Sequence, residues 1–138
     1  MKNILGILLI VFIYSCSKGD NSSISQYDLK VNKNIFLDNG KCLEIIDKEY
    51  EICLISINDS RCPSGGECVW EGDAVVEFNF KSKLENKSFS LHTNDELQQD
   101  TIINNLKIKL LNVLPYPTLN NHPINQSDYS AELIIFEE

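Results

Sequence analysis

The sequence predicts an all-β fold: a single antiparallel β-sandwich or partly closed barrel of about seven short strands, cross-linked by disulfides. The first observation behind this prediction is that apolar residues recur in short runs with an alternating, period-two pattern. The second is that turn-forming Asn, Asp, Gly and Pro separate these runs at short intervals. Helical periodicity is nearly absent, so the sequence favours strands throughout.

Seven strands are predicted along the chain, at residues 28–37, 41–46, 50–58, 73–81, 87–92, 106–114 and 129–136. The alternation is clearest in LKIKLLNVL, where Leu106, Ile108 and Leu110 share one face. Residues 93–100 are predicted to form a loop, because they contain almost no apolar side chain. Residues 115–128 are a long Pro- and Asn-rich connection, and connections of this length in all-β domains often carry function.

The N-terminus predicts a lipoprotein signal peptide over residues 1–15. Lys2 supplies a positive charge, and the apolar stretch at residues 4–14 is too short to span a bilayer as a helix. Residues 13–16 (IYSC) resemble the lipobox of bacterial lipoproteins, in which a small residue precedes the cysteine. The resemblance implies cleavage before Cys16 and acylation of Cys16 with fatty acid.

Residues 16–27 are predicted to be the lipidated N-terminus and a flexible tether, and residues 28–138 a single all-β domain. The stretch SKGDNSSISQ lacks apolar periodicity. It is similar to the Ser-Lys-acidic tag of surface-exported lipoproteins in one Gram-negative group. The sequence therefore predicts an exported protein anchored by lipid in the cell envelope, at the outer membrane, with the periplasmic and surface faces both left open.

The charge of the chain limits its partners. The formal net charge is −8, and removal of residues 1–15 takes away one lysine and makes it −9. Nucleic-acid binding needs a basic face, and anionic lipid headgroups attract basic segments. We therefore expect no nucleic-acid partner and a membrane contact made through the lipid alone.

Four cysteines remain after the lipidated one, and three disulfide pairings are possible for them. KCLEIIDKEYEICLI is typical of a hairpin turning around residues 47–48. If residues whose numbers sum to 95 face each other, Cys42 lies opposite Cys53, within reach of a disulfide. Cys62 and Cys68 then close a short loop, which the intervening Pro and Gly-Gly favour.

The segment DSRCPSGGECVW at residues 59–70 concentrates unusual residues: two of these cysteines, the only arginine and the only tryptophan. A structural interpretation accounts for them. Asp59 accepts hydrogen bonds from nearby backbone N–H groups, and Arg61 pairs with Asp59 or Glu67. Trp70 buries its ring under the loop and bonds its indole N–H to a carbonyl. The same residues form a candidate binding or structural loop.

Chemical alternatives for this segment are less favoured. The spacing C-x5-C is not the C-x2-C of structural zinc sites, and His92 and His122 are distant in sequence. A redox-active pair would need C-x-x-C at a helix N-terminus. A nucleophilic serine would need a histidine base and an orienting acid, and no G-x-S-x-G elbow occurs. The sequence predicts no metal, no cofactor and no catalytic residue.

The same residues resemble a family of small exported bacterial lipoproteins. The family signature is D-S-R-C-P followed by C-V/I-W-x-G, and here it corresponds to residues 59–63 and 68–72. The family also carries Pro-Tyr-Pro and a final strand led by tyrosine, here residues 115–117 and 129–136. The resemblance implies an exported lipoprotein and transfers no catalytic residue. The Cys42–Cys53 bridge is not part of the signature.

These observations leave several functions open. The leading hypothesis is a non-enzymatic binding or structural module that uses its loops to contact an envelope or extracellular protein or a glycan. The first alternative is a protease inhibitor that presents the disulfide-closed loop 62–68. The second is an ion-binding or hydrolytic domain that uses the carboxylates around Asp95, Glu96 and Asp100.

Overall fold

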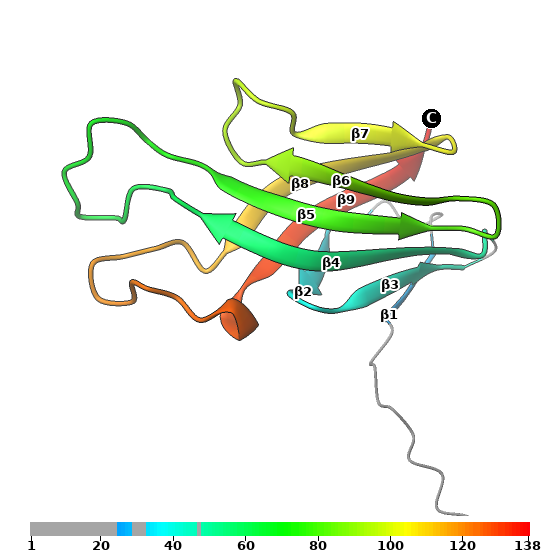
Figure 1. The fold of residues 1–138 in the computed structure, drawn as a ribbon, viewed down its shortest axis with the longest axis horizontal. Coiled ribbons are helices and arrows are strands. Elements are labelled where there is room, and N and C mark those ends of the chain that lie inside the picture. Colours follow the sequence, from blue (N-terminus) through cyan, green and yellow to red (C-terminus); the bar gives the residue numbers. More distant parts are fainter. Residues whose placement is uncertain (1–24, 29–32, 47) are drawn as a thin grey trace, which may run out of the picture.

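The computed structural model describes residues 25–28, 33–46 and 48–138. The predicted signal peptide, Cys16 and residues 16–24 of the predicted tether lie outside the described residues. The described chain forms nine strands and one short 3₁₀ helix (Figure 1). They are β1 (Ser25–Tyr27), β2 (Ile35–Asp38), β3 (Cys42–Ile45), β4 (Tyr50–Asp59), β5 (Ala74–Lys81), β6 (Asn86–His92), β7 (Asp100–Ile103), β8 (Leu106–Leu114), η1 (Gln126–Asp128) and β9 (Ser130–Glu137).

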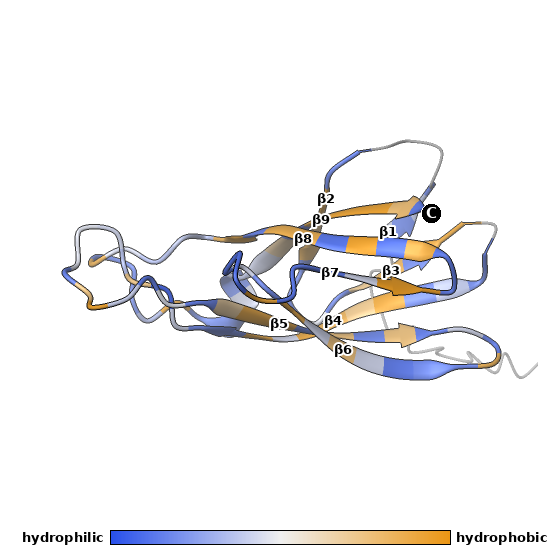
Figure 2. Ribbon diagram, turned by 90° about the horizontal axis from the view of Figure 1, so that it is seen from above, coloured by the Kyte–Doolittle hydropathy of each residue, from blue (hydrophilic) through white to orange (hydrophobic). Residues whose placement is uncertain are grey.

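The strands build two sheets that face each other. The first has the order β1-β3-β4-β5-β6 and the second the order β2-β9-β8-β7. Figure 2 shows the two layers, with β8 and β9 on one side and β4, β5 and β6 on the other. All pairs are antiparallel except β1 with β3. The sheets are open, so the predicted all-β fold is confirmed and takes the form of a sandwich. Among the described residues, no helix is long and apolar enough to cross a bilayer.

Six of the seven predicted strands are present within a residue or two of the expected bounds. The prediction of one strand at residues 28–37 is wrong in the described part, because the strand there is β2 and begins only at Ile35. Two strands were not predicted. The strand β1 lies inside the predicted tether, so the sandwich includes Ser25–Tyr27 as well as the predicted domain. The strand β7 forms a hairpin with β8 through Asn104 and Asn105, whose φ angles are 50° and 63°.

The core lies between the sheets and follows the alternation seen in the sequence. In β5, Val76, Phe78 and Phe80 are fully buried, and Leu106 and Ile108 fill the facing positions of β8. Burial of apolar side chains contributes about 25 cal/mol for each Å² removed from water. The interior of the sandwich is therefore the main source of its stability.

Two β-bulges, near the middle of β4 and of β8, change the direction of side chains. In β4 and in β8 the ladder skips one residue, which leaves Ile55 and Leu111 without a residue opposite them. Both are exposed, and Ile57 and Val113 resume the buried positions beyond the bulges. Bulges re-aim side chains in this way and are common beside functional sites.

The disulfide Cys42–Cys53 joins β3 to β4 in the predicted register. Cys42 lies opposite Cys53, and Leu43 lies opposite Ile52. The two Cα atoms are 4.0 Å apart, and the sulfur atoms are bonded. The prediction that residue numbers summing to 95 face each other is confirmed.

Candidate functional site

Three loops meet at one end of the sandwich: residues 60–73 between β4 and β5, residues 93–99 between β6 and β7, and residues 115–129 between β8 and β9. We call them together the loop end. Figure 1 shows the first and third of these loops extending beyond the sheets on the same side. They are joined by a backbone hydrogen bond of 2.8 Å from the N–H of Ser64 to the carbonyl of Pro117.

The loop 60–73 begins and ends as a continuation of the β4–β5 ladder. The N–H of Ser60 donates to the carbonyl of Asp73, and the N–H of Cys62 donates to the carbonyl of Glu71, both at 2.7 Å. Gly72 has a φ of 75°, and a Cβ there would lie 2.0 Å from the carbonyl oxygen of Ser60. Only glycine fits this close approach of two backbone segments.

The disulfide Cys62–Cys68 closes the tip of this loop, as predicted, with Cα atoms 5.9 Å apart. Inside it, the N–H of Gly66 donates to the carbonyl of Pro63 at 2.8 Å and forms a tight turn. Gly65 has a φ of 85°, which the turn requires. The loop is therefore a compact turn. Recognition by strand addition requires an extended segment, so this loop does not suit that mode of binding.

Arg61 is the buried centre of the loop end and is only 7% exposed. Its Nε and Nη2 donate to the two carboxylate oxygens of Asp59 at 2.8 and 2.7 Å. Its Nη1 donates to the carbonyl of Val113 at 2.8 Å, and Nη2 also donates to the carbonyl of Pro115 at 3.2 Å. The guanidinium carbon lies 4.6 Å from the ring centroid of Tyr116. Arg61 thus fixes the end of β8 and the start of loop 115–129 against β4.

Asp59 completes this network from the other side. Its carboxylate also accepts hydrogen bonds from the backbone N–H of Arg61 and the hydroxyl of Tyr129, each at 3.1 Å. Burial raises the pKa of Asp59, but the hydrogen bonds and charge of Arg61 outweigh burial and hold the pKa below its usual range. Burial and the adjacent Asp59 carboxylate raise the pKa of Tyr129 to about 12. At neutral pH the network therefore holds an ionised Asp59 and a neutral Tyr129.

A second carboxylate, Asp73, anchors the loop 93–99. It accepts hydrogen bonds from the backbone N–H groups of Thr93 and Asn94, both at 3.0 Å, and lies 2.6 Å from Nδ1 of His92. Burial raises the pKa of Asp73, but the hydrogen bonds from His92 and from the loop residues lower it further than burial raises it. His92 ends β6, as predicted.

The His92–Asp73 pair resembles the base and orienting acid of a catalytic triad. Among the described residues, no hydroxyl is hydrogen-bonded to the other ring nitrogen of His92. The Ser60 hydroxyl donates instead to the backbone carbonyl of Asp73 at 2.9 Å. The pair positions the loop 93–99 and was not predicted from the sequence. The register of the β5–β6 hairpin places His92 opposite Val75, two residues after Asp73. A predicted register could therefore have indicated that His92 and Asp73 lie close together.

One predicted residue of the segment 59–70 lies elsewhere than expected. The prediction that Trp70 is buried is wrong, because the side chain is 69% exposed. The loop extends beyond both sheets (Figure 1), so that no second layer covers the ring. Arg61 pairs with Asp59 rather than with Glu67, which is exposed.

The first and third loops of the loop end expose four large apolar side chains, which we call the apolar tip. Val69 and Trp70 lie on the first loop, and Tyr116 and Leu119 lie on the third. Leu119 packs beside Gly65, since a Cβ on that glycine would lie 3.5 Å from the Leu119 side chain. The two loops thus present apolar groups from one cross-linked and hydrogen-bonded unit.

Beside the apolar tip is a cleft of about 350 Å³. All three loops and the bulged part of β8 contribute to its lining, which includes Arg61, Glu71, Asp95, Leu111, Asn112 and Tyr116. A volume of this size is at the lower end of the range for sites that bind small molecules or single side chains. The cleft was not predicted from the sequence, because its walls come together only through the bulge in β8 and the anchoring of loop 93–99.

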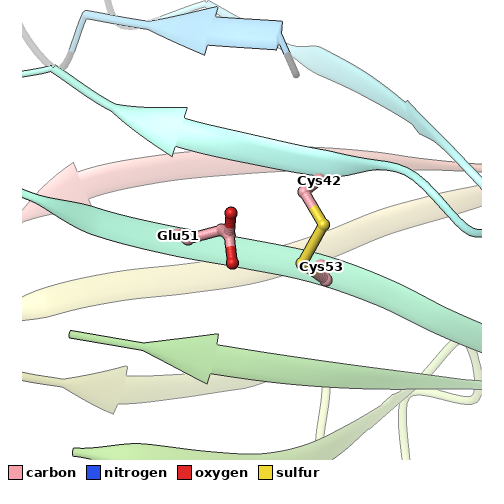
Figure 3. A group of neighbouring side chains, drawn as sticks. All are labelled: Cys42, Glu51 and Cys53. Atoms are coloured by element: carbon pink, nitrogen blue, oxygen red, sulfur yellow. A yellow bond between two sulfur atoms is a disulfide. The ribbon is translucent and has the colours of Figure 1, made fainter. Parts of the chain in front are cut away.

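Side chains of the types that bind metals come close together at one place on the described sheet. Within the part of the chain that the structure describes, only Cys42, Glu51 and Cys53 bring three His, Cys, Asp or Glu ligand atoms within 4.8 Å of one another. Figure 3 shows that the two sulfur atoms are bonded to each other, so that neither is a thiolate ligand. The carboxylates of Asp95, Glu96 and Asp100 do not form such a group.

Comparison of the chain with protein-family models, with curated proteins and with solved structures gives no match.

Proposed function

We propose that this chain is a lipid-anchored envelope lipoprotein, and that its sandwich is a non-enzymatic module that binds a partner protein through the loop end. The observation that carries the proposal is the exposure of Val69 and Trp70 on a cross-linked loop. Tryptophan is among the residues that contribute most to protein interfaces, and exposed apolar groups gathered at one place mark interaction sites.

The rigidity of the loop end supports this role. The Cys62–Cys68 disulfide, the fork of Arg61 on Asp59 and the turn at Gly66 hold the tip in one conformation before any partner arrives. A preorganised surface loses less conformational entropy on binding, and the affinity gains accordingly. A purely structural role would not require large apolar side chains to be exposed.

Export and lipid anchoring rest on the N-terminal sequence together with the cysteines. Residues 13–16 resemble a lipobox, and the resemblance of residues 59–72 to exported lipoproteins agrees with it. The two disulfides add support, because such bonds form and persist in oxidising compartments outside the cytoplasm.

The binding role is tested by placing a photo-crosslinking amino acid at Val69 in cells that produce the full chain. Leu84 is the matched control, since both side chains are almost fully exposed and Leu84 lies in the β5–β6 turn at the opposite end. We expect a discrete, protease-sensitive adduct from position 69, lost in the Trp70→Ala variant, and none from position 84. Equal crosslinking from both positions, or a protease-resistant glycan adduct, would contradict a protein partner at the loop end.

Anchoring is tested separately with an alkyne-labelled palmitate analogue. We expect the wild-type chain to incorporate the label and to sediment with the outer membrane. The Cys16→Ala variant should do neither. Labelling of this variant would show that the lipid is attached elsewhere.

A further inference from the structure

Charge is unevenly distributed over the sandwich. The loop end contains no lysine, and it carries six carboxylates, those of Glu67, Glu71, Asp73, Asp95, Glu96 and Asp128. Its one guanidinium, Arg61, is already paired with Asp59. The hairpins at the opposite end carry a cluster of lysines, namely Lys48, Lys81, Lys83, Lys87 and Lys107. The surface around the apolar tip is therefore anionic, whereas the opposite end is mixed in charge.

The cleft beside the apolar tip combines this negative charge with two apolar groups in a mainly polar lining. Glu71 and Asp95 are exposed carboxylates at its border, and the charge of Arg61 in its lining is neutralised by Asp59. Leu111 and the ring of Tyr116 supply apolar surface. Leu111 faces outward only because of the bulge in β8. A cleft with a mainly polar lining, one aliphatic and one aromatic side chain and an anionic rim matches a side chain that has an apolar stem and a cationic end.

We propose that the cleft receives a lysine or arginine side chain of the partner protein while Val69 and Trp70 enter an apolar depression on that partner. This inference rests on the proposed function and adds the chemistry of the partner, a basic surface with an apolar pocket. Opposite charge across an interface speeds association and excludes wrong partners, and it adds modestly to affinity when the charges stay exposed. Anionic membranes are disfavoured as the occupant for the same electrostatic reason.

The test uses the full chain in a non-ionic detergent and the synthetic peptide acetyl-Leu-Arg-Leu-Arg-amide. Its counterpart has citrulline, an uncharged analogue of the same shape, in place of each arginine. Binding is measured by isothermal titration calorimetry, and the emission of Trp70, the only tryptophan, reports whether the loop end is involved. We expect the arginine peptide to bind more tightly than the citrulline peptide, and added salt to remove the difference.

The variant Glu71→Gln/Asp95→Asn removes both rim charges at exposed positions and should preserve the fold. Glu85→Gln/Glu138→Gln, at the opposite end, is the matched control. We expect the first variant to weaken binding of the arginine peptide about fivefold, which is the effect of two partly exposed ion pairs, and the second to leave it unchanged. Circular dichroism checks that both variants fold.

Three results would overturn the inference. The two peptides could bind equally, the rim variant could bind like the wild type, or calcium chloride could displace the peptide better than sodium chloride at equal ionic strength. The last result would make the cleft a cation site. If the crosslink from position 69 to a protein is seen but the arginine peptide fails to bind, the binding role stands and only the chemistry inferred for the partner is wrong.

Discussion

Replacement of Asp59 by asparagine tests whether the loop end depends on its buried ion pair. The side chains of Arg61 and Asp59 are only 5% and 3% exposed, and the carboxylate accepts four hydrogen bonds, three from Arg61 and one from Tyr129. Asparagine is neutral and keeps one of the two acceptor oxygens, so that a buried guanidinium is left without its countercharge. Removal of one partner of a buried pair costs about 3–5 kcal/mol. We expect a loss of this size in the free energy of unfolding.

The assay is urea unfolding followed by circular dichroism, with both disulfides intact. The matched control is Glu49→Gln, which removes the partner of Lys83 in an exposed ion pair and should cost less than about 1 kcal/mol. If Asp59→Asn costs no more than this control, the network is not structural and the argument for a rigid loop end is refuted.

The pH dependence of unfolding is a second test of the Asp59–Arg61 pair. The pKa of Asp59 is lower in the folded than in the unfolded chain, so the carboxylate contributes stability above the unfolded pKa of about 4. That contribution is lost as the pH falls from about 4 through the folded pKa. We expect wild type to lose stability more steeply than Asp59→Asn in this acid range.

Three further predictions concern the same end of the molecule. The pKa of Tyr129 is about 12 in the folded chain and about 10 in the unfolded chain, so wild-type stability should fall as the pH rises between these values. In urea titrations, the Tyr129→Phe variant should lack this part of the fall. The Cys62→Ser/Cys68→Ser variant should lose about 2 kcal/mol in the same assay, and an unchanged midpoint would show that the bridge does not stabilise the fold. Gly72→Ala should lower the melting temperature clearly more than Gly40→Ala. Both glycines have a φ of 75°, but only a Cβ at position 72 would clash with the backbone. Equal effects would contradict the close approach of Gly72 to the Ser60 backbone.

The parts of the fold that depend on local alternation could be predicted from the sequence. A strand with one buried face must place apolar residues at every second position, and β5 and β8 do so. The same rule aligned β3 with β4 and located the Cys42–Cys53 bridge. For Arg61 the sequence left a choice between Asp59 and Glu67, and the structure selects Asp59.

The remaining features depend on contacts between distant segments. The strand β1 is three residues long and mostly polar, so that only its pairing with β3 identifies it. The turn Asn104–Asn105 was a usable signal for β7, because asparagine tolerates positive φ in two-residue hairpin turns. Trp70 was assigned to the interior on its size alone, although burial depends on a second layer that no local pattern reveals. The cleft was missed for the same reason.

The Cys42–Cys53 bridge has a mechanical consequence for a chain pulled from its N-terminal side. The pull would act first on β1 and then on β2, which are held to the sandwich by the hydrogen bonds of three and four residue pairs. Beyond β2 the tension reaches Cys42, where a covalent bond passes it directly to β4, a central strand paired along most of its length with β5. Unfolding under tension from the N-terminal side would stop at the Cys42–Cys53 disulfide. The parts of the loop end that continue from β4, β5 and β8 would stay attached under tension that has already removed the first two strands, whereas the hydrogen bonds from Asn39 to Gln126 and Tyr129 would be lost.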